Sequence, residues 1–73
     1  MSAWRFTRHA DERLASMGLT RRDVLAVLLR PDVSYQQQRG GQIWQRAALA
    51  VVTARDEPVV ITVLWNRKEN WRR

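Results

Sequence analysis

The sequence predicts a single α+β domain: a short N-terminal strand, a helical hairpin, and then a four-stranded antiparallel sheet with the helices packed on one face. Apolar residues recur at helical spacing as far as Pro31, which interrupts the helical pattern. Beyond Pro31 the apolar residues alternate with period two, and turn residues separate the apolar runs. Helices followed by hairpin-linked strands are typical of α+β folds. We place the domain at residues 1–66, followed by a basic C-terminal tail at 67–73.

Local signals define the elements before Pro31. Residues 4–7 alternate large apolar and polar side chains, which predicts a short strand. Helical spacing over 8–17 predicts the first helix, and Gly18 is a typical residue just past a helix end. A Thr-Arg-Arg-Asp run with the spacing of a capping box then predicts a second helix over 21–30. The very short link between the helices predicts a tight hairpin.

Four strands are predicted after Pro31, and Gly-rich or polar turns separate them. They lie at 33–38, 42–46, 48–54 and 59–65. The last two runs are apolar at nearly every position, so we expect these two strands in the centre of the sheet.

The charge balance indicates polyanionic partners. The 73 residues include thirteen Lys and Arg against seven Asp and Glu, for a formal net charge of +6. Such a surplus favours nucleic acid, an acidic protein or an anionic surface. Twelve of the thirteen cations are arginine, which binds phosphate with two prongs; a GC-rich genome is the alternative explanation for the arginine bias. Because a domain of this size is marginally stable alone, a homodimer is a further expectation.

Several classes of protein are excluded by what the sequence lacks. It has no cysteine, so it forms neither disulfides nor thiolate metal sites. No apolar run approaches the roughly 20 residues of a membrane span, and the N-terminus has no signal-peptide core. We expect a cytoplasmic protein with no membrane contact, no metal and no cofactor.

His9, the only histidine, is the obvious candidate for proton transfer. Arg13 follows four residues later, so both side chains share one face of the first predicted helix. Histidine is the side chain that titrates nearest to neutral pH. The alternative is that His9 packs near the helix start and that Arg13 pairs with a neighbouring acid or loop.

The predicted sheet supplies further candidates for an RNA-cleaving site. Arg13 and Arg46 are expected to hold a phosphate, and Thr62 to donate a hydrogen bond to it, while His9 transfers protons. Trp44 and Trp65 are expected to pack within the sheet. Residues predicted to bind nucleic acid are Arg8, Tyr35, Arg39, Arg67 and Lys68.

The sequence resembles a small bacterial and phage domain family of unknown function, which opens with F-T-x-H-A-x-x-R and closes on a strand of the type V-I-T-V. The resemblance rests on residues 6–14, 18–24, 31–33 and 60–63. That family is similar to small RNase toxins with RelE-like, colicin-like and barnase-like folds. The resemblance implies helices followed by a four-stranded antiparallel sheet. It also implies that His9, Arg13 and Thr62 occupy the family's polar positions, with Arg46 a less secure match; Met17 and the basic tail depart from the pattern.

We therefore expect a toxin-like, metal-independent endoribonuclease that an antitoxin neutralises. One alternative is a non-enzymatic phage or mobile-element module that binds a host protein or nucleic acid. Another is a DNA-binding repressor, because the two helices have roughly the lengths of a helix-turn-helix. The second helix is, however, too apolar to lie in a DNA groove, and only Arg21 and Arg22 could contact DNA from it.

Overall fold

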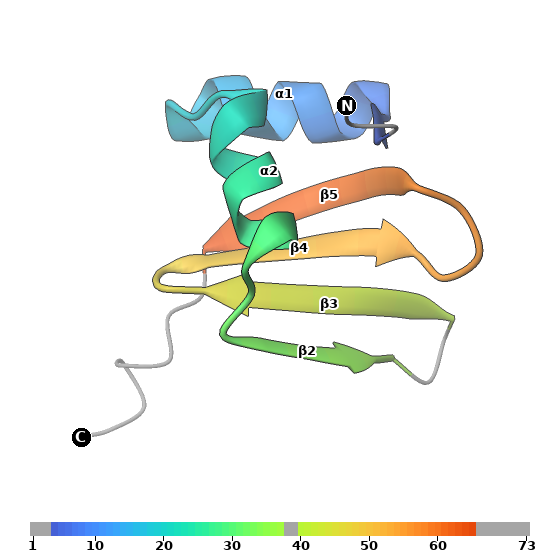
Figure 1. Ribbon diagram of the computed structural model, residues 1–73. Helices are drawn as coiled ribbons and strands as arrows, with labels where there is room; N and C mark the ends of the chain where they lie inside the picture. Colours follow the sequence, from blue (N-terminus) through green and yellow to red (C-terminus); the bar gives the residue numbers. More distant parts are fainter. Residues whose placement is uncertain (1–3, 38–39, 66–73) are drawn as a thin grey trace.

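The computed structural model describes residues 4–37 and 40–65 and confirms the predicted α+β class. In this part of the chain the elements are β1 (Arg5–Phe6), α1 (Arg8–Met17), α2 (Arg21–Leu29), β2 (Val33–Gln36), β3 (Gly41–Arg46), β4 (Leu49–Ala54) and β5 (Val59–Trp65). Figure 1 shows α2 lying across the sheet and α1 running along β5. The predicted basic tail at 67–73 lies outside the described residues.

The sheet differs from the prediction in its first strand. Its order is β1-β5-β4-β3-β2, so it has five strands rather than four. Neighbours from β2 to β5 are antiparallel, but β1 is parallel to β5, which makes the sheet mixed. The amide of Arg5 donates to the carbonyl of Pro58 (2.8 Å) and the amide of Thr7 donates to that of Val60 (3.1 Å). The short N-terminal strand therefore joins the sheet at the β5 side, which the prediction of a purely antiparallel sheet missed.

Both helices form where the sequence predicts them. Gly18 ends α1 with φ of 72°, a left-handed conformation that glycine adopts without steric cost. At the start of α2 the Asp23 carboxylate accepts a hydrogen bond from the amide of Thr20 at 2.9 Å, as a capping box requires. The helix ends at Leu29, two residues before Pro31, because proline disfavours helical geometry in the residue before it.

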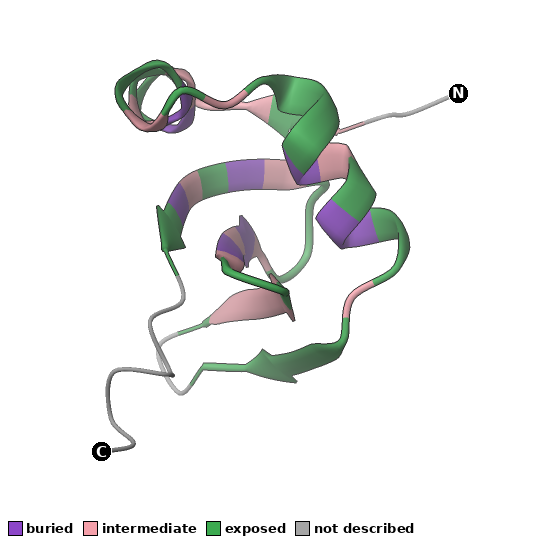
Figure 2. Ribbon diagram, turned by 90° about the vertical axis from the view of Figure 1, so that its left-hand side faces the viewer, coloured by how far each residue is buried: buried purple, intermediate pink, exposed green. Residues whose placement is uncertain are grey.

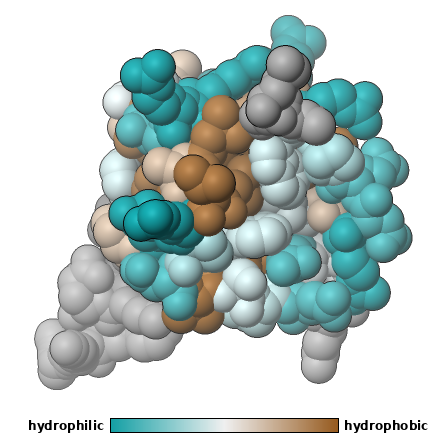
Figure 3. All heavy atoms as spheres, in the orientation of Figure 1, coloured by the Kyte–Doolittle hydropathy of each residue, from teal (hydrophilic) through white to brown (hydrophobic). Residues whose placement is uncertain are grey.

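The hydrophobic core lies between the two helices and one face of β4 and β5. Its buried members are Ala10, Leu14, Val24, Val27, Leu28, Val51, Val60 and Val63. Figure 2 shows these buried positions on the facing sides of the helices and the sheet. Full burial of a valine or leucine side chain contributes about 1.5 to 3 kcal/mol, so this cluster is a substantial source of stability. Figure 3 shows a further group of apolar residues on the side that carries α2.

The opposite face of the sheet is covered by none of the described helices, and we call it the helix-free face. Val51 and Val63 pair with each other and face the core, so their neighbours along each strand point the other way. Following the register outward gives the members of the helix-free face as Val33, Tyr35, Ile43, Gln45, Ala50, Val52, Ala54, Thr62 and Leu64. These side chains are either apolar or polar without charge. Tyr35 and Leu64 remain 46% and 42% exposed.

Candidate functional site

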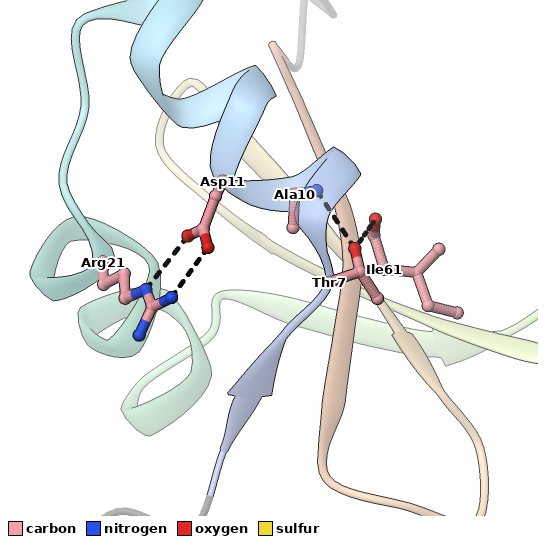
Figure 4. A network of polar contacts seen from close by, with 5 residues as sticks. All are labelled: Thr7, Ala10, Asp11, Arg21 and Ile61. Carbon is pink, nitrogen blue, oxygen red and sulfur yellow. Dashed lines mark hydrogen bonds and ion pairs between the residues drawn. The ribbon is translucent and has the colours of Figure 1, made fainter.

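The first turn of α1 is fixed to β5 through Thr7. Thr7 has extended backbone geometry as the N-cap of α1, and its Oγ1 accepts a hydrogen bond from the amide of Ala10 at 3.0 Å. The same hydroxyl donates to the carbonyl of Ile61, also at 3.0 Å. Figure 4 shows this oxygen between the helix and the strand. One side chain thus begins the helix and binds it to the sheet.

Arg13 makes a second contact between α1 and β5. Its Nε donates to the carbonyl of Val63 at 3.2 Å, in a half-buried position. β1 pairs only with Val59 and Val60, so it leaves the carbonyls of Ile61 and Val63 without a strand partner on that side. Thr7 and Arg13 satisfy these two carbonyls. The Nη groups of Arg13 make no hydrogen bond within the described residues.

Asp11 connects the two helices on the other side of α1. Both of its oxygens accept hydrogen bonds from Arg21, from Nε at 3.0 Å and from Nη2 at 2.7 Å (Figure 4). These bonds lower the pKa of Asp11 and raise the pKa of Arg21. The guanidinium of Arg21 also lies over the ring of Phe6, 4.8 Å from its centroid. β1, α1 and α2 therefore meet at this pair.

His9 lies in the first turn of α1 and is exposed. Within the described residues its imidazole makes no hydrogen bond and no ion pair. Its neighbour Arg8 is also exposed and lies 3.5 Å from the Glu12 carboxylate. Because Arg13 is one helical turn further on, His9 and Arg13 share a face of α1, as the sequence predicts.

Arg46 and Thr62 are not brought to this face. Arg46, at the end of β3, is exposed, and its Nη1 donates to the carbonyl of Ala26 in α2 at 3.3 Å. Thr62 pairs with Val52, and its side chain belongs to the helix-free face. The four predicted catalytic residues therefore occupy three separate places, and only His9 and Arg13 lie together.

The predicted nucleic-acid ligands are also dispersed. Tyr35 lies on the helix-free face, and its hydroxyl accepts a hydrogen bond from Nε2 of Gln45 at 3.3 Å. Arg8 is on α1, away from that face. The remaining three, Arg39, Arg67 and Lys68, lie outside the described residues.

Of the two tryptophans expected to pack within the sheet, Trp44 does so. Its ring meets that of Trp4 edge to face with centroids 6.2 Å apart, and its Nε1 donates to Thr53 Oγ1 at 3.0 Å. Thr53 is only 1% exposed, so this bond satisfies a buried hydroxyl. Trp65, at the end of β5, is 42% exposed.

Sequence reasoning missed two residues that hold this part of the molecule together, Thr7 and Arg21. A signal for Thr7 was present, because threonine before a helical run is a preferred N-cap. No sequence signal pairs Arg21 with Asp11 across a helical link, since their contact depends on how the helices cross. Residues 4–37 and 40–65 contain no group of three His, Cys, Asp or Glu placed to hold a metal ion. None of their helices is long and apolar enough to cross a membrane.

Comparison with known proteins places the chain in a family. Searches among curated proteins and among solved structures found no match. A protein-family model described as "Domain of unknown function (DUF4258)" matches residues 6–65. The match runs from the last residue of β1 to the end of β5 and so includes His9, Arg13, both helices and the strands β2 to β5. The chain therefore belongs to the DUF4258 family.

Proposed function

We propose that this protein is a metal-independent ribonuclease in which His9 transfers protons and Arg13 binds the phosphate. The observation that supports the proposal is the division of roles within the run from Phe6 to Arg13. Phe6 packs against the core and Thr7 caps α1, while Ala10 is fully buried. His9 alone in this run combines exposure with the absence of any packing or hydrogen-bonding role among the described residues.

The chemistry matches these two side chains. When the 2′-hydroxyl of RNA attacks the neighbouring phosphate, cleavage needs two kinds of group. One accepts and returns a proton, and the other is a cation that stabilises the charged phosphate. Arg13 is anchored through Nε, which holds the guanidinium in place and leaves its Nη groups for a phosphate oxygen. Arg8, one residue before His9, adds a second cation to the same end of the helix.

Arg46 and Thr62 are left out of the proposed site. Arg46 is bonded to α2, and Thr62 belongs to the other face of the sheet. The expected RNA-binding contribution of the C-terminal segment is retained, because residues 66–73 carry four cations and one acid. The described residues, in contrast, carry eight arginines against six acids, so they contribute little of the net charge. Removing residues 66–73 is expected to weaken RNA binding and to reduce its dependence on salt.

The decisive experiment compares RNA cleavage by the wild type, His9→Gln and Arg55→Gln in the presence of EDTA. His9→Gln is expected to lower the rate by about 100-fold or more, since general acid–base groups contribute about 10² to 10⁴. Its melting temperature should equal that of the wild type, because the His9 imidazole makes no hydrogen bond or ion pair with the residues that the structure describes. Arg55→Gln is the control, because it removes an exposed cation in the turn between β4 and β5, away from the proposed site, and we expect only a small loss of rate. Equal cleavage by the wild type and His9→Gln would contradict the proposal.

A second candidate is a binding module without enzymatic activity. It is favoured by the helix-free face, whose uncharged and partly exposed side chains are typical of protein-binding surfaces. The absence of RNA cleavage by the wild type, under all conditions that preserve the fold, would select this function over the first.

A further inference from the structure

The two outer edges of the sheet are treated differently by the rest of the chain. On the β5 side, β1 pairs with the start of the strand, and Thr7 and Arg13 bond the carbonyls beyond it. On the other side β2 is the last strand in the order, and all four of its residues are exposed. Within the described residues no element or side chain bonds the outer edge of β2.

The hydrogen-bond register shows which backbone groups β2 offers. The amide of Gln37 donates to the carbonyl of Gly41 at 2.8 Å, so residue 37 faces β3. In an antiparallel pair such residues alternate, so Val33 and Tyr35 also face β3, whereas Ser34 and Gln36 face outward. The outer edge therefore presents two amide groups and two carbonyl groups in the spacing of a strand.

β2 is a short strand of four residues, but it lacks the other features by which edge strands usually avoid pairing. Monomeric proteins protect an open edge with charged residues, a proline or a bulge. The sequence Val-Ser-Tyr-Gln has no charge and no proline, and its pairing with β3 is regular. Tyr35 continues a row across the helix-free face through Ile43 and Val52. A strand added beside β2 would extend this row.

We propose that the outer edge of β2 accepts an extended segment of an acidic protein partner, in which apolar residues alternate with Asp or Glu. The apolar residues would continue the row at Tyr35, on a face with no charged side chain. The acidic residues suit the charges beside the start of β2, where the exposed Arg30 and Arg46 outnumber the single acid Asp32.

A second copy of the chain is a weaker candidate for this edge. It would bring another charge of +6. Pairing through the four residues of β2 buries much less than the roughly 1,200 Å² that a stable interface needs. Attraction between opposite charges therefore has to strengthen the pairing, and two copies of the same basic chain do not provide it.

The test uses the full chain and a display library of random peptides. Enriched peptides are expected to alternate apolar with acidic residues and to bind Ser34→Ala as they bind the wild type. Ser34→Pro, which removes one outward amide without touching the pairing with β3, should weaken binding by about tenfold. Binding should also weaken as salt is raised.

Amide hydrogen exchange provides an independent readout should Ser34→Pro fail to fold. In the free protein the amides of Ser34 and Gln36 should exchange fast and that of Tyr35 slowly; bound peptide should slow the first two. The proposal is overturned by any of three results: no enriched peptide, enriched peptides that leave both amides fast, or a dimer in sedimentation that Ser34→Pro dissociates. None of these results depends on RNA cleavage, since Ser34 and Gln36 lie outside the proposed ribonuclease site.

Discussion

The two edges of this sheet differ in whether other parts of the described chain bond their outer backbone groups: the edge beside β5 is bonded, and the edge at β2 is not. At the β5 edge, the two-residue strand β1 and the side chains of Thr7 and Arg13 satisfy the backbone of a strand fifty or more residues away. At the β2 edge, an uncharged strand presents its backbone to solvent. The DUF4258 match begins at Phe6, within the segment that closes the first edge. The difference shows that Thr7 and Arg13, two polar residues of the matched region, serve the fold at one edge, whereas no described residue bonds the other edge.

Replacing Thr7 by valine is expected to have the largest effect on the closed edge. The change removes both the N-cap acceptor of α1 and the donor to the Ile61 carbonyl. We expect a loss of about 2 to 3 kcal/mol in the free energy of unfolding, measured by urea denaturation. Thr7→Ser keeps the hydroxyl and should remain close to the wild type. A loss as large in Thr7→Ser would show that the methyl group, and not the oxygen, matters.

Arg13→Met should be the next most damaging change. It keeps much of the aliphatic length of the side chain but removes the donor to the half-buried Val63 carbonyl. The expected loss is about 2 kcal/mol in the free energy of unfolding, typical of a hydrogen bond from a charged group. Arg8→Met, on the exposed side of the same helix, is the control and should cost much less. Equal losses would mean that Arg13 does not close the edge.

Asp11→Asn tests the ion pair between Asp11 and Arg21, which joins the two helices beside the closed edge. Because this pair is exposed, we expect a smaller loss in the free energy of unfolding than for Arg13→Met. The pKa of Asp11 is lowered in the folded protein, so its contribution is present above the pKa of the unfolded chain and is lost as the pH falls through the folded pKa. The difference in melting temperature between the wild type and Asp11→Asn should therefore be largest near neutral pH and should shrink below about pH 4. A difference that grows on acidification would contradict this assignment.

Ser34→Pro should have the smallest effect on stability, because the outward amide of Ser34 has no partner in the sheet. We expect a change within about 0.5 kcal/mol in urea denaturation. Tyr35→Pro is the contrasting variant, since it removes an amide that faces β3, and it should be strongly destabilising. If both variants lose the same free energy of unfolding, the amide of Ser34 does not face outward from the sheet as described.

Local signals explain how much of this structure the sequence predicts. Gly18, Pro31 and the Thr20–Asp23 cap set the helix ends through neighbouring residues, and the predicted helices agree with the structure to within one residue. The parallel pairing of Arg5 with Val59 has no such signal, because nothing near Arg5 specifies which edge the segment will join. The prediction of a purely antiparallel sheet was wrong for this reason.

The candidate site follows the same division. Placing His9 and Arg13 on one helix face needs only helical geometry, and the structure agrees. Adding Arg46 and Thr62 requires knowing where α2 crosses the sheet and which face each strand residue takes. A one-residue change in register moves a side chain to the other face, and Thr62 lies beside the β4–β5 irregularity at Ile61. Apolar periodicity therefore could not show that Thr62 lies on the helix-free face of the sheet, on the other side from His9.

The Thr7 hydroxyl has a consequence for how the protein is made. Its strand partner, Ile61, lies 54 residues further along the chain, so the segment around Thr7 cannot dock until that strand has been synthesised. Such distant contacts slow folding, because a long loop must close before they form. A nascent chain of this protein thus keeps its first helix undocked from the sheet until β5 has left the ribosome.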